Sequence, residues 1–212
     1  MKKLIIVGAG GYAKSVLDSV DYMNFKMIGY IDDIKAKGEY HQGYPVLGNS
    51  IDCLETPESY VYFVAIGNNA KRRGWFDKLK ANHLSLINVI DKSALISPAS
   101  TIGEGCFIGK LAILNHGSSV GDNCVINTRA LVEHGCVIKN HVNLSTNSTL
   151  NGDVICKNGS FIGSGSVING QITIGEWALV GSGAVVIKDV KEHTVVVGIP
   201  AKEIKSTSHK YN

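Results

Sequence analysis

The strongest constraint on the fold is an unbroken six-residue repeat in the second half of this 212-residue chain. Every sixth position from Ile96 to Val186 is aliphatic in 15 of 16 cases, and the remaining one is Cys156. Two residues before these positions, 13 of 16 residues are Ala, Ser or Cys. Chance does not hold such a register over 91 residues without a slip, so the repeat dictates the architecture here.

A six-residue period with one large and one small apolar position is typical of a coil with three flat sides. Each side is a short strand that points its aliphatic side chain inward, and each corner is tight and favours small residues. Three sides make one rung, so residues 18 apart in the sequence stack on one another. Residues 94–189 therefore predict a little over five stacked rungs around a continuous core.

The repeat also accounts for four of the five cysteines. Cys106, Cys124 and Cys136 fall in the small-residue class and Cys156 in the aliphatic class, so all four are predicted core residues. An odd number of cysteines without a CxxC spacing argues against a disulfide framework and against a zinc site. We therefore expect a cytoplasmic protein without a metal, and Cys53 receives no role.

The first 91 residues have a different texture, in which strand and helix patterns alternate. Such alternation predicts βαβ units around a small parallel sheet. We therefore predict a Rossmann-like domain over residues 1–91 and a repeat domain over residues 92–212. The expected strands are 3–8, 27–33, 60–67 and 84–91, and the expected helices are 12–22 and 71–81.

Glycines and polar residues follow the first three predicted strands. In open α/β sheets, ligands bind at the carboxyl ends of the strands, and a glycine-rich turn can hold a phosphate at a helix N-terminus. The full GxGxxG motif is absent because Ala13 occupies its last position, and the domain is too short for nicotinamide binding. The glycines alternatively only make the turn. The predicted ligand-binding residues are Gly10, Gly11, Lys14, Asp32 and Asn68.

Composition and charge exclude several classes of protein. With 44% hydrophobic and 18% charged residues the chain is not disordered. A net charge of +3 is too small to indicate a nucleic-acid partner. No apolar stretch approaches the roughly 18 residues of a membrane span. The apolar run at residues 4–7 is too short for a signal peptide and is interpreted as the first strand.

Five stretches carry a resemblance to a known family: YHQGYPVLGN (40–49), FIGKLAILN (107–115), VINTRALVEHG (125–135), STNSTLNGDV (145–154) and VINGQ (167–171). With the repeat, they resemble the hexapeptide-repeat sugar acyltransferases, and among these the sialic acid O-acetyltransferase (NeuD) family. The resemblance covers essentially the whole chain and implies a left-handed parallel β-helix. It also implies a homotrimer with active sites between subunits, acetyl-CoA as co-substrate, and a sugar acceptor in the N-terminal crevice.

The activity that this resemblance implies is O-acetylation of sialic acid, free or CMP-activated, in bacterial surface (capsule) polysaccharide biosynthesis. The family's general base ends an N-x5-E-H pattern, which here runs from Asn127 to His134. His134 is then the base, with Glu133 or Asn127 orienting its ring, because an imidazole suits proton transfer from an acceptor at neutral pH. The repeat places His134 at a corner, with Gly152 one rung away. The Gly152 N–H is the predicted oxyanion donor for direct transfer in a ternary complex.

The resemblance further implies a cofactor groove and shows two departures from related enzymes. Nucleotide-sugar N-acetyltransferases of this kind commonly carry an acidic residue directly after the base, where this chain has Gly135. They often carry a second His nine residues after the base, where this chain has Asn143. What orients the imidazole therefore stays open. The implied acetyl-CoA-binding residues are Asn143, Gly152, Ser164, Gly181 and Lys202, with Lys205 nearby.

Two other functions remain as alternatives. An N-acetyltransferase of a nucleotide-linked 4-amino sugar shares the fold and the base, although Gly135 and Asn143 count against it. A non-catalytic activator of a sialic acid biosynthetic enzyme would use the repeat as an interaction surface and would tolerate His134→Ala. A purely structural β-helix is the weakest alternative, because it does not explain a His and a Gly stacked at one corner.

Overall fold

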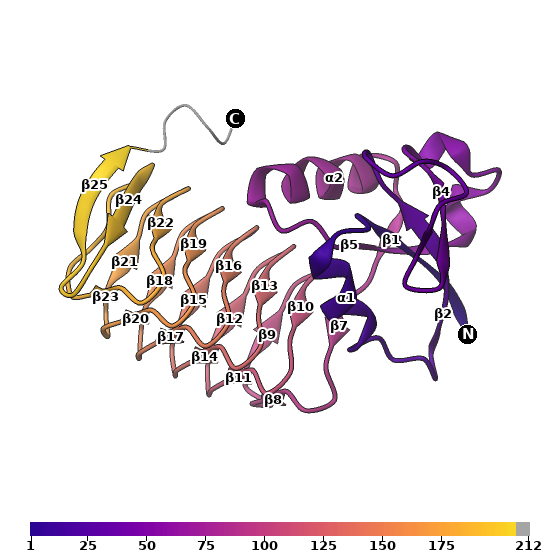
Figure 1. The fold of residues 1–212 in the computed structure, drawn as a ribbon. Coiled ribbons are helices and arrows are strands. Elements are labelled where there is room, and N and C mark those ends of the chain that lie inside the picture. The colour runs from indigo at the N-terminus through magenta and orange to yellow at the C-terminus, as the bar shows by residue number, and fades with distance from the viewer. Residues whose placement is uncertain (207–212) are drawn as a thin grey trace.

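A computed structural model describes residues 1–206 and contains an α/β domain followed by a parallel β-helix (Figure 1). The last six residues of the predicted second domain, 207–212, lie outside the described residues. The N-terminal domain lies at one end of the coil, and the rungs continue away from it toward a hairpin at the other end (Figure 1).

The N-terminal sheet has six strands in the order β3-β4-β2-β1-β5-β6. Its neighbouring strands are parallel except for the hairpin of β3 and β4, which the sequence analysis did not predict. The strands are β1 (Lys2–Val7), β2 (Phe25–Ile31), β3 (Tyr40–His41), β4 (Tyr44–Gly48), β5 (Val61–Val64) and β6 (Ser85–Leu86). The helices are α1 (Gly11–Leu17) and α2 (Asn69–Ala81), with 3₁₀ turns at Ile51–Cys53 and Pro57–Ser59.

Helix α1 is shorter than the predicted helix over residues 12–22. It ends at Leu17, and the next turn is held by a tertiary contact in which Ser19 Oγ donates to Asp91 Oδ2 at 2.6 Å. Both residues are buried. A buried hydrogen bond to a residue 72 positions away thus holds the turn after the helix, which a local helical pattern cannot reveal.

The β-helix has three faces, each a parallel sheet of two-residue strands. The first face contains β7 (Val89–Ile90), β10 (Phe107–Ile108), β13 (Val125–Ile126), β16 (Asn143–Leu144), β19 (Phe161–Ile162) and β22 (Leu179–Val180). The second contains β8 (Leu95–Ile96), β11 (Ile113–Leu114), β14 (Leu131–Val132), β17 (Thr149–Leu150), β20 (Val167–Ile168) and β23 (Val185–Val186). The third contains β9 (Thr101–Ile102), β12 (Ser119–Val120), β15 (Val137–Ile138), β18 (Ile155–Cys156) and β21 (Thr173–Ile174).

The rung length and the inward positions agree with the sequence pattern. Strands pair 18 residues apart, for example Phe107 with Val125, so the left-handed β-helix of hexapeptide repeats is confirmed. The repeated aliphatic positions from Ile108 to Val186 are buried, as are the four cysteines of the repeat. The coil ends in an antiparallel hairpin of β24 (Thr194–Val197) and β25 (Lys202–Ser206), which extends the first face.

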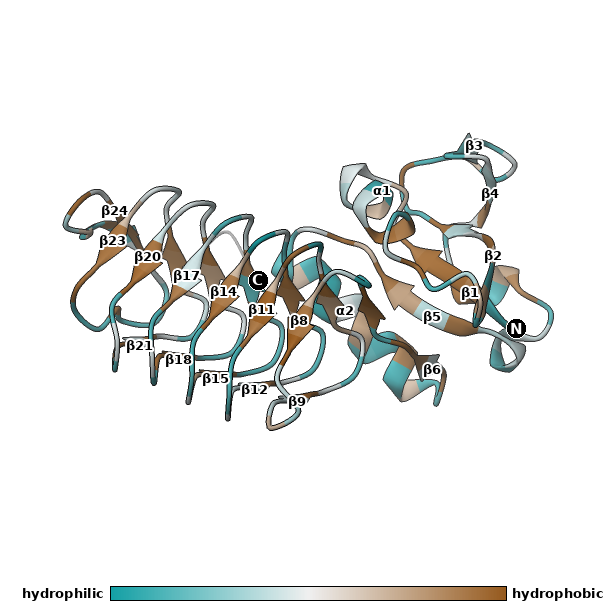
Figure 2. Cartoon of the chain, turned by 90° about the horizontal axis from the view of Figure 1, so that it is seen from below, coloured by the Kyte–Doolittle hydropathy of each residue, from teal (hydrophilic) through white to brown (hydrophobic). Residues whose placement is uncertain are grey.

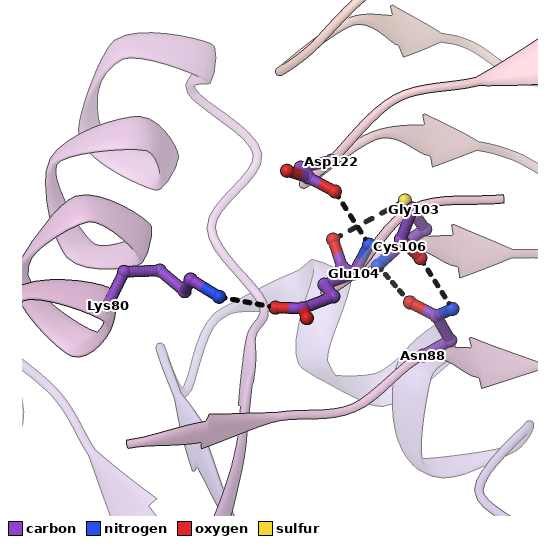
Figure 3. Close-up of polar contacts among 6 residues, drawn as sticks. All are labelled: Lys80, Asn88, Gly103, Glu104, Cys106 and Asp122. Carbon is purple, nitrogen blue, oxygen red and sulfur yellow. Dashed lines mark hydrogen bonds and ion pairs between the residues drawn. The ribbon is translucent and has the colours of Figure 1, made fainter. Parts of the chain in front are cut away.

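The prediction of one strand over residues 84–91 is wrong. Strand β6 pairs with β5 in the first domain, whereas β7 pairs with β10 in the β-helix. Asn88 lies between the two strands and fixes the transition: its Nδ2 donates to Gly103 O at 2.7 Å, and its Oδ1 accepts from Cys106 N at 2.8 Å (Figure 3). The coil therefore begins one side earlier than the repeat that starts at residue 94.

Helix α2 packs against the corner where the third face meets the first. Its Arg72 is 1% exposed and donates from Nε to Asn123 O at 3.2 Å and from Nη2 to His141 O at 2.9 Å. Asn69 donates from Nδ2 to Gly159 O at 3.0 Å. These contacts reach three successive rungs at one corner, so they fix the N-terminal domain onto the β-helix.

The far end of α2 is held at the same corner by an ion pair. Lys80 Nζ lies 2.7 Å from Glu104 Oε2, and the Glu104 N–H donates to Asp122 Oδ1 at 2.8 Å (Figure 3). Lys80 and Glu104 are solvent-exposed, so this pair contributes little to stability beside the buried Arg72 contacts.

Candidate active site

His134 lies at the corner between β14 and β15, where the second face meets the third. Its ring lies over the backbone of Gly152 in the next rung. A Cβ added at Gly152 would lie 2.6 Å from His134 Nε2 and 3.1 Å from Nδ1, so any larger residue would displace the ring. His134 itself is exposed. The corner therefore exposes to solvent an imidazole that packs on the backbone of Gly152.

The Gly152 N–H lies beside this ring. Within residues 1–206 it donates no hydrogen bond, although the Gly152 carbonyl accepts from Gln171 N at 2.9 Å. A free backbone N–H next to a base is the donor that a developing oxyanion requires. The structure thus brings together the two groups, His134 and Gly152, that acyl transfer would need.

Glu133 and Asn127 do not contact the imidazole as expected. Glu133 Oε2 accepts from the backbone N–H of His134 at 3.3 Å, and Asn127 Oδ1 accepts from Thr128 N at 2.8 Å. Asn127 also lies at a different corner, between β13 and β14, because seven residues span more than one side of the coil. Neither side chain hydrogen-bonds to the His134 ring in the part of the chain that the structure describes.

An acidic residue missed by the sequence analysis lies next to this corner. Gly135 has φ +67°, and a Cβ added there would collide with Asp153 Oδ1 and lie 3.2 Å from Asp153 Cγ. The Asp153 N–H donates to His134 O at 2.9 Å. The signal was available in the sequence, because Asp153 stands 18 residues after Gly135.

The predicted acetyl-CoA residues do not form one site within a single chain. Gly152 lies with His134, whereas Ser164 and Gly181 lie at the corner between the first and second faces, as Asn127 does. Asn143 is buried in β16 on the first face, with its Oδ1 accepting from Ser145 Oγ at 3.3 Å. Lys202 and Lys205 are exposed on the terminal strand β25.

A cavity of about 350 Å³ opens at the carboxyl ends of β1, β2 and β5. Three of the predicted ligand-binding residues line it: Gly10, Gly11 and Asp32. Lys14 does not line it, because this residue of α1 is turned to solvent. The sequence analysis missed Lys71 and Trp75, which stand about one turn apart in α2, the helix that follows β5.

Asp32 organises the loops of this cavity. Its Oδ2 accepts from Ala9 N at 2.7 Å, and its Oδ1 accepts from Ile34 N at 2.9 Å and Lys35 N at 2.8 Å. Burial opposes ionisation, but these backbone donors lower the pKa of Asp32 below its usual value. The ionised carboxylate therefore ties the glycine-rich turn after β1 to the loop after β2.

A second cavity, of about 200 Å³, adjoins the first because Gly67 lines both. Asn68 and Asn69 line it from the start of α2, and the β-helix contributes aromatic and aliphatic side chains, among them Phe161 and Trp177. Asn68 Oδ1 accepts from Lys71 N at 2.9 Å and so caps α2. Predicted residue Asn68 thus lies beside the first cavity rather than in it.

Two further observations concern absent features. No helix among residues 1–206 combines the length and the apolar character needed to cross a membrane. The same range contains no group of three or more His, Cys, Asp or Glu side chains placed to hold a metal ion.

Comparison with known proteins identifies the family. Residues 3–79 match the PglD N-terminal domain, and residues 99–133 match the bacterial transferase hexapeptide repeats. Among solved structures, a variant of perosamine N-acetyltransferase from Caulobacter crescentus in complex with CoA and GDP-perosamine is 31% identical. It has a TM-score of 0.92, with 97% of this chain and 98% of that chain covered. The acetyltransferase domain of PglB from Neisseria gonorrhoeae in complex with acetyl coenzyme A is 32% identical, with a TM-score of 0.89 and coverages of 96% and 99%.

Curated relatives match over shorter lengths. The UDP-N-acetylbacillosamine N-acetyltransferase of Bacillus subtilis is 33% identical over 113 residues, which is 51% of this chain and 51% of that protein. An uncharacterized protein of Acanthamoeba polyphaga mimivirus is 31% identical over 106 residues, only 20% of its length. The matched segments thus span about half or less of these two relatives. From the full-length structural matches, the chain belongs to the sugar acetyltransferases that combine a PglD-type N-terminal domain with hexapeptide repeats.

These comparisons alter one expectation. Three of the four relatives described above are named for perosamine, bacillosamine or acetyl coenzyme A, and none of the four is named for sialic acid. They support the wider group of sugar acetyltransferases and favour the amino-sugar alternative over sialic acid O-acetylation.

Proposed function

We propose that this chain is an acetyl-CoA-dependent N-acetyltransferase that acts on a nucleotide-linked 4-amino sugar. The observation that carries the proposal is His134 lying over Gly152, with an imidazole and a free backbone N–H at one exposed corner. The cavity at the carboxyl ends of β1, β2 and β5 supplies a place for the nucleotide end of the acceptor. A full-length structural match to an enzyme complexed with both CoA and GDP-perosamine supports the same pair of substrates.

In the proposed reaction the neutral sugar amine attacks the thioester carbonyl of acetyl-CoA. A C–N bond forms, the C–S bond breaks, His134 takes the proton from the amine, and that proton passes to the departing thiolate. The Gly152 N–H stabilises the oxyanion of the transition state. Cys136 takes no part, because it is fully buried in the core, where burial raises the pKa of its thiol.

The predicted cofactor residues support a site completed by a second copy of the chain. His134 and Gly152 lie at one corner, and Asn127, Ser164 and Gly181 lie at the neighbouring corner. The second face separates these corners within one chain. Two copies that pack side by side would bring the unlike corners together and form a groove for acetyl-CoA.

The second face has the surface that such packing requires. Its outward positions are apolar at five of six rungs: Leu95, Ile113, Leu131, Val167 and Val185, with Thr149 between them. The strands of this face are mostly coloured as hydrophobic in Figure 2. Leu95 is 64% exposed in the single chain. A contiguous apolar column indicates a protein–protein contact, and a three-sided prism suits a threefold axis. We infer a homotrimer in which the acceptor cavity of one chain serves His134 of a neighbour.

The test is an acetyl-transfer assay with a panel of acceptors. Purified protein receives acetyl-CoA with GDP-perosamine, a UDP-linked 4-amino sugar, N-acetylneuraminic acid or its CMP-linked form. Mass spectrometry identifies the acetylated sugar, and resistance to mild alkali separates an amide from an ester. CoA is measured by chromatography, because the exposed Cys53 thiol would react with a thiol reagent.

We expect an amide product on an amino sugar and a loss of about 100-fold or more in kcat for His134→Asn. An alkali-labile product on either sialic acid would instead establish the O-acetyltransferase. No transfer to any acceptor, together with no binding of CoA, would favour the non-catalytic activator.

A further inference from the structure

We propose that Asp153 is the positioning residue for His134, supplied from the rung above the base rather than from the base's own rung. The proposal rests on the proposed role of His134 as the general base. It assigns to Asp153 the task of holding the ring and stabilising the imidazolium that forms when His134 takes a proton.

Two glycines create the arrangement. The ring of His134 reaches up over Gly152, and the carboxylate of Asp153 reaches down over Gly135. Each side chain occupies the volume that a Cβ on the opposing glycine would need. Because 134 and 135 are sequence neighbours, as are 152 and 153, the two side chains span the same pair of rungs from neighbouring positions.

The backbone fixes this crossing. The Asp153 N–H donates to the carbonyl oxygen of His134 at 2.9 Å, so the two residues are linked through the rung ladder. Asp153 has φ +61°, in the left-handed region that Asp tolerates better than most residues. The main chain of Asp153 is therefore fixed at this corner, one rung from His134.

The other polar groups around the ring do not perform this task. Glu133 has its carboxylate on the backbone N–H of His134, and Asn127 lies at another corner. His116, one rung below, accepts from Gly135 N at 3.1 Å through its carbonyl oxygen, and its side chain brings no negative charge. Asp153 is the acid whose carboxylate lies over Gly135, the residue that follows His134 in the chain.

A carboxylate near the base would assist the chemistry. A general-base imidazole becomes a cation, and a carboxylate beside it stabilises that cation and fixes the ring orientation. Within residues 1–206 neither a hydrogen bond nor an ion pair joins the Asp153 carboxylate to the ring. Catalytic hydrogen bonds are commonly long in free enzymes and shorten in the substrate complex, so we expect the carboxylate to reach the ring when the substrates bind.

The first experiment compares Asp153→Asn with Asp122→Asn. Both changes remove a carboxylate at a corner of the coil and keep its shape, but Asp122 lies at the α2 corner, away from His134. We expect Asp153→Asn to lower kcat by about 10-fold or more with the KM for acetyl-CoA changed less than about twofold. Asp122→Asn is expected to leave both unchanged. A kcat of Asp153→Asn equal to wild type would overturn the proposal.

The second experiment moves the acid by one rung. In the double variant Gly135→Asp, Asp153→Gly, the carboxylate stands directly after the base, in space that the lost Asp153 side chain has vacated. We expect the double variant to recover at least a third of the kcat lost in Asp153→Gly, whereas Gly135→Asp alone stays impaired by the collision with Asp153. If the double variant is no more active than Asp153→Gly, although it folds, a positioning role for the carboxylate is refuted.

The third readout does not depend on acetyl transfer. The ring nitrogen resonances of His134, identified among the seven histidines by their loss in His134→Gln, report the state of the imidazole in the free protein. Asp153→Asn is expected to move them and Asp122→Asn to leave them in place. Unmoved resonances would contradict the positioning role, whereas moved resonances in a protein that acetylates no sugar would contradict only the proposed function.

Discussion

The two regions of the molecule are held together in different ways. The β-helix repeats one unit, in which each two-residue strand pairs with strands 18 residues away and each rung contacts its neighbours. The N-terminal domain contains longer strands whose positions depend on helices and loops, for example β2 (Phe25–Ile31). The comparison shows that the six-residue period by itself fixes the strand pairing of the β-helix. The α/β domain depends instead on contacts between residues distant in sequence and on its interface with the β-helix.

The largest expected effect comes from weakening the interface between the N-terminal domain and the β-helix. Arg72→Leu would leave several backbone oxygens around the buried guanidinium without donors, including those of Asn123 and His141. We expect a loss of about 3–5 kcal/mol in unfolding free energy, because each buried acceptor left without a donor costs about 1–3 kcal/mol. Calorimetry should then resolve two transitions, one for each region.

Arg73→Leu is the matched control for this change. Arg73 is the next residue of α2, is exposed, pairs with Asp77 at 3.3 Å and lies 5.9 Å from the centroid of the Trp177 ring, an exposed contact of small energy. Its loss is expected to cost under about 1 kcal/mol. If both variants unfold alike, the junction does not depend on Arg72.

The next effect tests how closely the repeat must fit at the active corner. In Gly152→Ala the new methyl group would displace the His134 ring, and we expect kcat to fall by about 100-fold. The thermal midpoint should change little, because the corner is exposed and can relax. Steady-state kinetics and a melting curve separate the two effects, and a fully active variant would show that the ring does not work from this position.

A smaller effect concerns pH and the α2 corner. Burial lowers the pKa of His141 to about 4, an effect that Asp77 opposes and that Arg73 and Arg72 reinforce. The neutral ring also accepts at Nδ1 from Asn123 Nδ2 at 2.9 Å. Because the unfolded chain binds this proton near pH 6.5 and the folded chain only near 4, stability should fall as the pH drops through this window.

Urea unfolding at several pH values between 4 and 7 measures that decline. His141→Asn keeps a residue that tolerates φ +63° and removes the titrating group. Its urea midpoint should depend less on pH than that of the wild type. An equal slope in both proteins would assign the decline to other groups.

The smallest effect is a gain in the less regular region. Gly74 lies in α2 with open space around its Cβ position, so Gly74→Ala removes conformational freedom from the unfolded chain without a clash. We expect α2 and the domain to gain about 0.5–1 kcal/mol. Denaturant unfolding would show this gain, and a loss would mean that the helix surface contacts something absent from the single chain.

The sequence predicted the β-helix well because the same six-residue pattern of aliphatic and small residues recurs in every rung. It predicted the N-terminal elements approximately, since α1 ends where Ser19 meets Asp91, a contact no local pattern contains. The predicted strand over residues 84–91 is likewise divided where Asn88 hydrogen-bonds to the backbone of Gly103 and Cys106, which are distant in sequence.

At the candidate site, the sequence pointed to His134 and Gly152 because both obey the 18-residue spacing. It did not reveal Asp153, because the search for an acid considered only the sequence neighbours of His134. The neighbours of Gly152, which stacks on His134 one rung away, were not considered. Lys71 and Trp75 were missed because only folding brings α2 to the cavity at the ends of β1 and β2.

The hairpin that ends the coil has a consequence for the particle as a whole. A stack of parallel rungs offers an open edge to which another chain could add, in the manner of a growing fibre. Here β25 reverses direction, so the last edge on the first face is antiparallel to every rung beneath it. That edge carries the exposed, charged side chains of Lys202, Glu203 and Lys205, and charged side chains on an edge strand disfavour pairing with another chain. The reversed strand and its charges therefore oppose the addition of a further rung from another molecule.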